Sequence, residues 1–271
     1  MHYSAARTLS AAIFSIRRHD QKGDLIMKIA LACVPVVNGN IEHNSACILQ
    51  AMEACAGKAD LVVFGESVLQ GFDSLTWEYD SDRRIAVSLA DDPIIRICLA
   101  AKQIGIAVSF GYIEKDGSSL FSSQIVIDAF GSIIHKFRRV SKGWKEFRLT
   151  DEHYREGDDF EAFSYSGKRI AIGICGDLWT DGKPEAMRGL NADIVLWPVW
   201  CDYNADEWNS SIKHQYAEQA ALCGDAVLLV NTFCADPGAV DCAAGGAAYF
   251  KNGLIVQETP AGKSDILIVE V

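Results

Sequence analysis

Short apolar runs alternate along the chain with segments of helical periodicity. Eleven runs of four to eight mostly apolar residues are bounded by glycine, proline or polar residues, as expected of buried strands. Because this number exceeds an ordinary single sheet, the pattern predicts an α/β fold with two mixed sheets packed together. The predicted strands are 28–34, 61–64, 106–113, 123–129, 132–138, 169–174, 193–198, 226–231, 247–250, 254–257 and 266–269.

The intervening segments predict helices that cover the outer sheet faces. Apolar residues return every three to four positions in the longest of them, 207–223, which is typical of a helix with one buried face. Turn-forming residues at 116–122 and at Asn252-Gly253 predict hairpins, so part of each sheet is antiparallel. The predicted helices are Asn44–Ala56, Pro93–Lys102, Pro184–Gly189 and Glu207–Cys223.

Composition and charge narrow the possible functions. With 49% hydrophobic and 23% charged residues, the chain has the composition of a folded globular protein. A net charge of −11 without basic clusters argues against nucleic-acid binding, and no apolar segment reaches transmembrane length. Nine cysteines form no CxxC pair, which predicts free thiols and a cytoplasmic location.

Residues 1–26 differ from the rest of the chain. They lack the long apolar core of a signal peptide, and we expect a poorly ordered extension before one domain spanning 27–271. A strand-like run follows Met27 at once, so the sequence leaves open whether Met1 or Met27 is the initiator. The mass of the native N-terminus distinguishes the two.

Cys175 is the first candidate for chemistry. It ends the apolar run RIAIGIC and is followed by Gly-Asp, which places a thiol where a buried strand gives way to a tight turn. A nucleophile at such a position is held rigidly, and the amide of Gly176 is available to a developing oxyanion. The alternative is a buried structural cysteine, since free cysteine is among the most buried residue types.

Two further elements supply a base and a cation. Glu66 follows the apolar run LVVFG, and burial there would raise its pKa toward that of a general base. The stretch 133–146, IIHKFRRVSKGWKE, places several cations beyond another strand, and a cation beside Cys175 would stabilise both a thiolate and an oxyanion. Taken singly, each is better explained as a solvated strand end or turn.

Together these segments resemble the nitrilase superfamily of carbon–nitrogen hydrolases. LVVFGES is similar to the family's glutamate motif, GSIIHKFRRV to its lysine motif, and KRIAIGICGDLWTDGKPEAMRGLNADIVLWPVW to its nucleophile region. The resemblance runs from Met27 to the end of the chain. It implies a four-layer αββα sandwich, a Glu, Lys and Cys triad without metal or organic cofactor, and a homodimer or higher homo-oligomer.

The sequence departs from the family at the cation. Where the family has a catalytic lysine after an aromatic residue and an arginine, this chain reads Phe137-Arg138-Arg139. Three interpretations follow: Arg139 acts electrostatically, Lys142 or Lys145 reaches the same point, or the chain has lost activity. We rank the substitute lysine first, because the short segment SKGWKE contains Gly143 and could fold an ammonium back toward the site, whereas arginine is a poor proton donor.

Weaker resemblances extend the candidate site. Glu146 is spaced similarly to a second glutamate of aliphatic amidases in the family, and Trp200 lies where the family lines its pocket. Gly65 stands where the family often has proline. Asp177-Leu178-Trp179 replaces the arginines that carbamoylases of the family commonly carry after their cysteine.

The resemblance implies hydrolysis of a non-peptide C–N bond in a small amide through a thioester, with release of ammonia or an amine. Nitrile hydrolysis and acyl transfer use the same thioester and remain alternatives. A different kind of function is also possible: the chain could be a binding or scaffold protein that kept the fold and lost catalysis. The replacement of the family's lysine by Arg139 is the reason to consider it. The identity of the substrate does not follow from the sequence.

Overall fold

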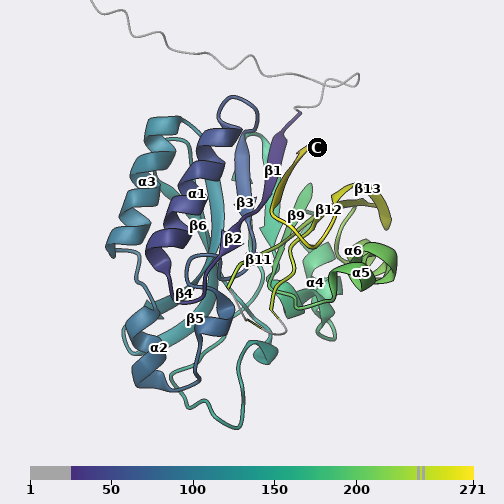
Figure 1. Cartoon of the computed structure of the whole chain (residues 1–271). Coiled ribbons are helices and arrows are strands. Elements are labelled where there is room, and N and C mark those ends of the chain that lie inside the picture. The colour runs from purple at the N-terminus through teal and green to yellow at the C-terminus, as the bar shows by residue number, and fades with distance from the viewer. Residues whose placement is uncertain (1–25, 237–238, 240–241) are drawn as a thin grey trace, which may run out of the picture.

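Two six-stranded sheets pack face to face and carry helices on their outer faces, so that the protein has four layers (Figure 1). This arrangement is seen in a computed structural model that describes residues 26–236, 239 and 242–271. The predicted αββα sandwich of two mixed sheets is confirmed. The predicted extension 1–26 falls outside the described residues, apart from Ile26, and stays a prediction.

The first sheet holds the strands that lead to Glu66 and Arg139. Its strand order is β14-β1-β3-β4-β5-β6, with parallel pairing among β1, β3 and β4 and antiparallel pairing elsewhere. The strands are β1 (Lys28–Cys33), β3 (Leu61–Phe64), β4 (Ala107–Asp116), β5 (Ser119–Ile127), β6 (Ile133–Arg138) and β14 (Asp265–Glu270).

The second sheet repeats this plan and leads to Cys175. Its order is β13-β12-β10-β9-β8-β7, with β8, β9 and β10 parallel and the remaining pairs antiparallel. Asn252 and Gly253 connect β12 to β13 with positive φ values of 50° and 78°, as a tight hairpin turn requires. The strands are β7 (Ala162–Tyr165), β8 (Lys168–Ile172), β9 (Ile194–Val199), β10 (Ala226–Asn231), β12 (Ala247–Lys251) and β13 (Leu254–Thr259).

Alternation along the strands divides the core into layers. In β1, Ile29 and Leu31 belong to the apolar cluster shared by the two sheets, whereas Ala30 and Ala32 belong to the cluster under the first helices. Helices α1 (Ile41–Cys55) and α3 (Asp92–Ile104) lie side by side over the first sheet, and α4 (Lys183–Gly189) and α6 (Lys213–Cys223) cover the second (Figure 1).

Smaller elements connect these layers. A two-stranded parallel sheet joins β2 (Pro35–Val36) to β11 (Phe233–Cys234). The remaining segments are η1 (Phe72–Ser74), α2 (Tyr79–Ile85), η2 (Lys142–Trp144), η3 (Cys175–Trp179), α5 (Ala205–Glu207) and the π-helical turn η4 (Trp208–Ile212). Among the described residues, no helix is both long and apolar enough to cross a membrane.

All eleven predicted strands occur, with ends that differ by a few residues. The sequence analysis missed β7, whose edge position leaves alternate residues partly exposed, and the two-residue strands β2 and β11. It also missed α2. The helix predicted over 207–223 contains the turn η4, so that only Lys213–Cys223 is regular α-helix.

Candidate active site

Three predicted site residues lie at strand ends in two different sheets. Glu66 follows β3 by two positions, Arg139 follows β6 directly, and Cys175 opens η3 after β8. Arg139 donates to Glu66 and lies against Gly176, so the residues that follow β3 and β8 lie close together. The charges of Glu66 and Arg139 both act on the Cys175 thiol, which places the three side chains together.

Glu66 is buried and held by two donors on one oxygen. Its Oε1 accepts hydrogen bonds from the Ser122 hydroxyl at 2.8 Å and from Nη1 of Arg139 at 3.0 Å. Only 1% of Glu66 and 6% of Arg139 is exposed. Both of these donors bind Oε1.

Arg139 spans from the base to the nucleophile loop. Its Nε donates to the Ser141 hydroxyl at 2.9 Å, and Nη2 lies so close to Gly176 that a Cβ there would stand 2.6 Å from it. Burial alone would lower the pKa of Arg139, but the charges of Glu66, Cys175 and Asp177 raise it above its usual value. The guanidinium is therefore a permanent positive charge beside Cys175 and Gly176.

Cys175 has a strained backbone, with a φ of 46° that few non-glycine residues adopt. Two tryptophans of β9 and its end hold it: Nε1 of Trp197 donates to the Cys175 carbonyl at 2.8 Å, and Sγ lies 3.9 Å from the Trp200 carbonyl. A hydrogen bond with the Cys201 thiol, burial and the charge of Glu66 raise the pKa of Cys175, which Arg139 opposes. Cys175 is thus a thiol at rest and would need a base to act as a nucleophile.

Asp177 ties the cation to the nucleophile. Its buried carboxylate accepts from the backbone amides of Val140 at 3.1 Å, Ser141 at 2.7 Å and Ile174 at 2.9 Å. Burial raises the pKa of Asp177 to about 6, although Arg139 and these hydrogen bonds act in the opposite direction. The contacts join the residues that follow Arg139 to the residue that precedes Cys175, in line with a structural task.

Glycines allow the two sheets to meet at Glu66. A Cβ on Gly65 would stand 2.3 Å from Oγ1 of Thr232 and 2.9 Å from the Val199 carbonyl. Val199 ends β9 of the second sheet, and Thr232 directly follows β10. A Cβ on Gly111 would stand 2.8 Å from Cα of Glu66. Gly65 is therefore required by close backbone approach rather than by a turn.

The two lysines ranked first do not lie at this site. Lys142 is exposed in η2, and Lys145 pairs with Glu156 at 2.8 Å while it also donates to the Tyr154 carbonyl. Glu146 is exposed as well. The structure brings Arg139, and neither lysine, to Glu66, because the loop turns outward directly after Ser141. Our ranking of a substitute lysine therefore does not match the geometry.

Comparison with known proteins agrees with this arrangement. The family model described as carbon-nitrogen hydrolase matches residues 28–271, nearly the whole described chain. The chain belongs to the carbon–nitrogen hydrolase family.

Two curated relatives of this family have different activities. The chain is 28% identical over 200 residues to an aliphatic nitrilase of Rhodococcus rhodochrous, covering 66% of this chain and 50% of the relative. It is 26% identical over 170 residues to an (R)-stereoselective amidase of Pseudomonas sp., covering 63% of this chain and 59% of that protein. The matches thus span roughly half the length of these relatives.

Among solved structures, a variant of the amidase from Nesterenkonia sp. AN1 has a similar fold. It superposes with a TM-score of 0.67 at 17% identity and covers 90% of this chain and 93% of that one. That structure shows acrylamide added to the active-site cysteine of the amidase. At this identity the likeness supports the fold alone.

Trp200 lies beside the nucleophile of this hydrolase fold. Its carbonyl is the neighbour of Cys175 Sγ, and its indole Nε1 donates to Oδ2 of Asp73 at 3.2 Å. Burial, followed by the charges of Asp202 and Asp236, raises the pKa of Asp73, and the Trp200 hydrogen bond opposes this. The ring is mostly buried, so Trp200 is as much a packing residue as a wall of the site.

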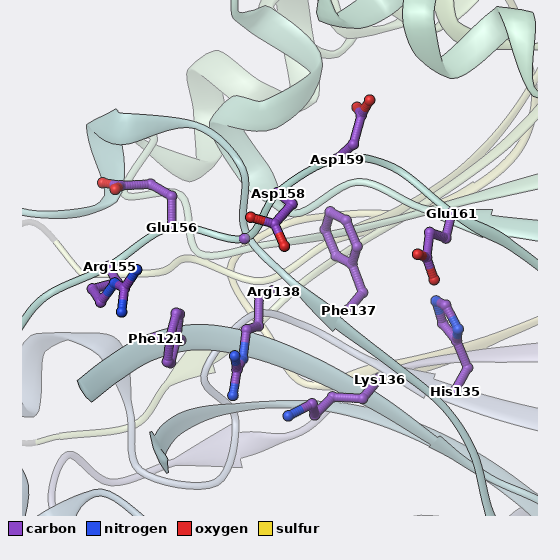
Figure 2. Close-up of a pocket in the computed structure, with 11 residues that line it drawn as sticks. Phe121, His135, Lys136, Phe137, Arg138, Arg155, Glu156, Asp158, Asp159 and Glu161 are labelled. Atoms are coloured by element: carbon purple, nitrogen blue, oxygen red, sulfur yellow. The ribbon is translucent and has the colours of Figure 1, made fainter. Parts of the chain in front are cut away.

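A cavity of about 270 Å³ lies on the other side of β6 (Figure 2). Arg138 extends into it, with its guanidinium 3.7 Å from the centre of the Phe121 ring, and pairs with Glu114 at 2.7 Å. Successive arginines thus point to opposite faces, Arg138 to this cavity and Arg139 to Glu66. The described residues that line the cavity do not include Cys175, Glu66 or Arg139.

Sequence analysis missed the residues that hold the carbon–nitrogen hydrolase site in place. Ser122 and Ser141 bind Glu66 and Arg139, and Thr232 donates from Oγ1 to the Glu66 carbonyl at 3.1 Å. Ser122 and Ser123 are adjacent in β5 and both are buried, so a pair of serines beside an apolar run was one available signal. Nothing in the spacing of Ser141 or Thr232 marks them as neighbours of Glu66.

Proposed function

We propose that this protein hydrolyses a non-peptide C–N bond in a small amide through a thioester on Cys175. The observation that carries the proposal is the placement of the Cys175 thiol beside a buried ion pair of the Glu66 carboxylate and the Arg139 guanidinium. A permanently charged cation and a carboxylate beside a thiol on a strained turn are suited to covalent catalysis.

In the proposed reaction, Glu66 accepts the thiol proton as Sγ of Cys175 attacks the amide carbon. The oxyanion of the tetrahedral intermediate is stabilised by Arg139 and by the backbone N–H of Gly176. The C–N bond then breaks, and the departing nitrogen takes its proton. Water attacks the thioester, again with Glu66 as base, and releases the acid and the free thiol.

Arg139 determines where the leaving-group proton comes from. Because the charges around it raise the pKa of Arg139, the guanidinium holds its proton throughout the cycle. Glu66 therefore both removes the thiol proton and returns it to the leaving amine. In this proposal the cation acts by charge alone, which removes the need for a lysine at the family's third position.

An amide is our preferred substrate class, with an ω-amide as one form of it. The relatives include both a nitrilase and an amidase, and a nitrile would form the same thioester. A carbamoyl amine is less favoured, because the buried Asp177 and Leu178 stand where carbamoylases carry arginines. Acyl transfer to an acceptor other than water uses the same first half of the reaction.

Ammonia release from a panel of short amides, ω-amides, carbamoyl amines and nitriles tests the proposal. We expect turnover on at least one amide by the full chain and none by Cys175→Ala. Hydroxylamine added to the reaction should yield a hydroxamate from the thioester, and preferred formation of transfer product would favour an acyltransferase. If no panel member reacts and no acyl group is found on Cys175 by mass spectrometry, the noncatalytic scaffold becomes the better interpretation.

The predicted homodimer and cytoplasmic location stay predictions. Sedimentation of the purified protein measures the first directly.

A further inference from the structure

A second thiol lies against the proposed nucleophile. Cys201 follows Trp200, whose carbonyl is 3.9 Å from Sγ of Cys175, and the two thiols are hydrogen-bonded to each other. Both sulfurs are free. Two strand ends that are distant in sequence, those of β8 and β9, therefore bring a pair of thiols together at the site.

Cys201 is held firmly in this position. Its backbone N–H donates to Oδ1 of Asn231 at 2.9 Å, its carbonyl accepts from Nδ2 of Asn231 at 2.9 Å, and its sulfur lies 3.6 Å from the Tyr216 hydroxyl. Its side chain is buried, with 7% of the residue exposed. The proposed hydrolysis uses a nucleophile, a base and a cation, and leaves this ordered thiol without a task.

The other cysteines differ in their surroundings. Cys33 and Cys223 are buried, and burial raises the pKa of each, to about 11 and about 12. Cys242 is hydrogen-bonded to Cys234, a second pair at a different place in the fold. Among the described cysteines, the pair of Cys175 and Cys201 is the one in which a thiol lies beside a buried carboxylate and a cation.

We propose that Cys175 and Cys201 are a redox-active pair, which a peroxide converts to a reversible intramolecular disulfide. In the first step the sulfur of Cys175, deprotonated by Glu66, attacks the peroxide, the O–O bond breaks, and a sulfenic acid and water form. In the second, the Cys201 sulfur attacks the sulfenic sulfur, the S–S bond forms, and the departing hydroxide takes the Cys201 proton as water. Two thiols and one hydrogen peroxide thus give one disulfide and two waters.

The pair protects the nucleophile from permanent damage. A sulfenic acid without a neighbouring thiol proceeds to sulfinic acid, which thiols do not reduce. Because Cys201 lies beside Cys175, its attack on the sulfenic sulfur is intramolecular and competes with a second peroxide. The consequence for activity rests on the proposed function, whereas the cross-link itself does not.

The test treats the reduced full chain with a small excess of hydrogen peroxide, blocks free thiols with iodoacetamide and maps the peptides by mass spectrometry. We expect a cross-link between the Cys175 and Cys201 peptides, lighter by two hydrogen atoms, and its loss on treatment with dithiothreitol. In Cys201→Ala we expect sulfinic acid on Cys175 that dithiothreitol does not reverse. Cys234→Ala is the matched control and should behave as the wild type.

Several outcomes would overturn the proposal. Sulfinic acid on Cys175 in the wild type with Cys201 still reduced would do so, as would a Cys234–Cys242 cross-link that forms first. If Cys201→Ala fails to fold, phenylarsine oxide on the wild type replaces it, because one arsenic bridges two adjacent thiols and should protect Cys175 and Cys201 together. Alkylation of either thiol despite the arsenical would contradict the pairing. A chain that hydrolyses nothing but forms the cross-link would reject the hydrolase and keep the redox pair.

Discussion

Nη1 of Arg139 donates to Oε1 of Glu66 at 3.0 Å in an ion pair whose side chains are 7% and 2% exposed. A buried pair of this kind is strongly destabilised when one partner is removed, because the other charge is left uncompensated. The same pair stands beside the thiol, so its loss affects both stability and chemistry. These two effects can be separated by experiment.

Arg139→Met should lower kcat/KM by about 100-fold, because the oxyanion loses its main cation. Ammonia release measures this. Lys142→Met and Lys145→Met are the matched controls, and both should stay near the wild-type rate. A large loss in either lysine variant, with Arg139→Met still active, would restore our first ranking of a substitute lysine.

The stability effect has its own test. Arg139→Met should lower the free energy of unfolding by about 3–5 kcal/mol, since it leaves Glu66 buried without its partner. Adding Glu66→Gln removes that charge and should recover most of the loss without recovering activity. Urea denaturation followed by circular dichroism gives both values. Recovery of activity in the double variant would rule out Glu66 as the base.

Ser122→Ala should lower kcat about tenfold with little change in KM, because Glu66 loses the hydroxyl that orients it while the pocket keeps its shape. Ser123→Ala is the control, since its hydroxyl donates to Glu114 at 2.6 Å and not to Glu66. Steady-state kinetics of both variants gives kcat and KM separately. Equal effects of the two variants would indicate a loss of general packing.

Alkylation of Cys175 by iodoacetamide should accelerate as the pH rises, because the hydrogen bond with Cys201, burial and Glu66 raise its pKa and thiolate is scarce at neutral pH. Removing Cys201 with Cys201→Ala lowers that pKa and should move the rate profile to lower pH. Arg139→Met removes a charge that favours the thiolate and should move it to higher pH. Peptide mapping between about pH 6 and pH 10 follows each cysteine, and the profile of Cys98 on α3 should not move.

Gly65→Ala should destabilise the protein by about 3 kcal/mol, because the added methyl would overlap Oγ1 of Thr232 and backbone atoms that cannot move freely. Gly143→Ala is the control, since a Cβ there meets nothing within 4 Å. Thermal unfolding compares the two. Equal melting temperatures would mean that the two sheets move apart enough at this contact to accommodate the methyl group.

Much of this site could be predicted from sequence because its chemistry lies at strand ends. The runs that end near Glu66 and at Cys175 are apolar and continuous, so the functional groups at their ends can be identified without a structure. The direction of Arg139 was not visible. It depends on the Ser141 hydroxyl, on the outward turn that carries Lys142 away and on the bare backbone of Gly176, and the last of these is a tertiary contact.

The layers were predictable for the same reason, and their exceptions have physical causes. In β1, alternate side chains of the segment Ile29–Ala32 point to the two faces of the sheet. Once two sheets are assumed, this alternation assigns one face to the other sheet and one to the helices. In contrast, β7 is a short edge strand, and α2 is fixed by Asp82, which accepts from the backbone N–H of Thr76 and from the Tyr154 hydroxyl. Local sequence patterns carry no signal for such distant partners.

The contact of Gly65 with Thr232 joins the sheet that carries Glu66 and Arg139 to the sheet that carries Cys175. Sliding one sheet along the other would therefore separate Glu66 from Cys175 before either strand lost its own hydrogen bonds. Heating should accordingly abolish turnover at a temperature where both sheets are still formed. Loss of activity would then report movement of one sheet along the other before either sheet unfolds.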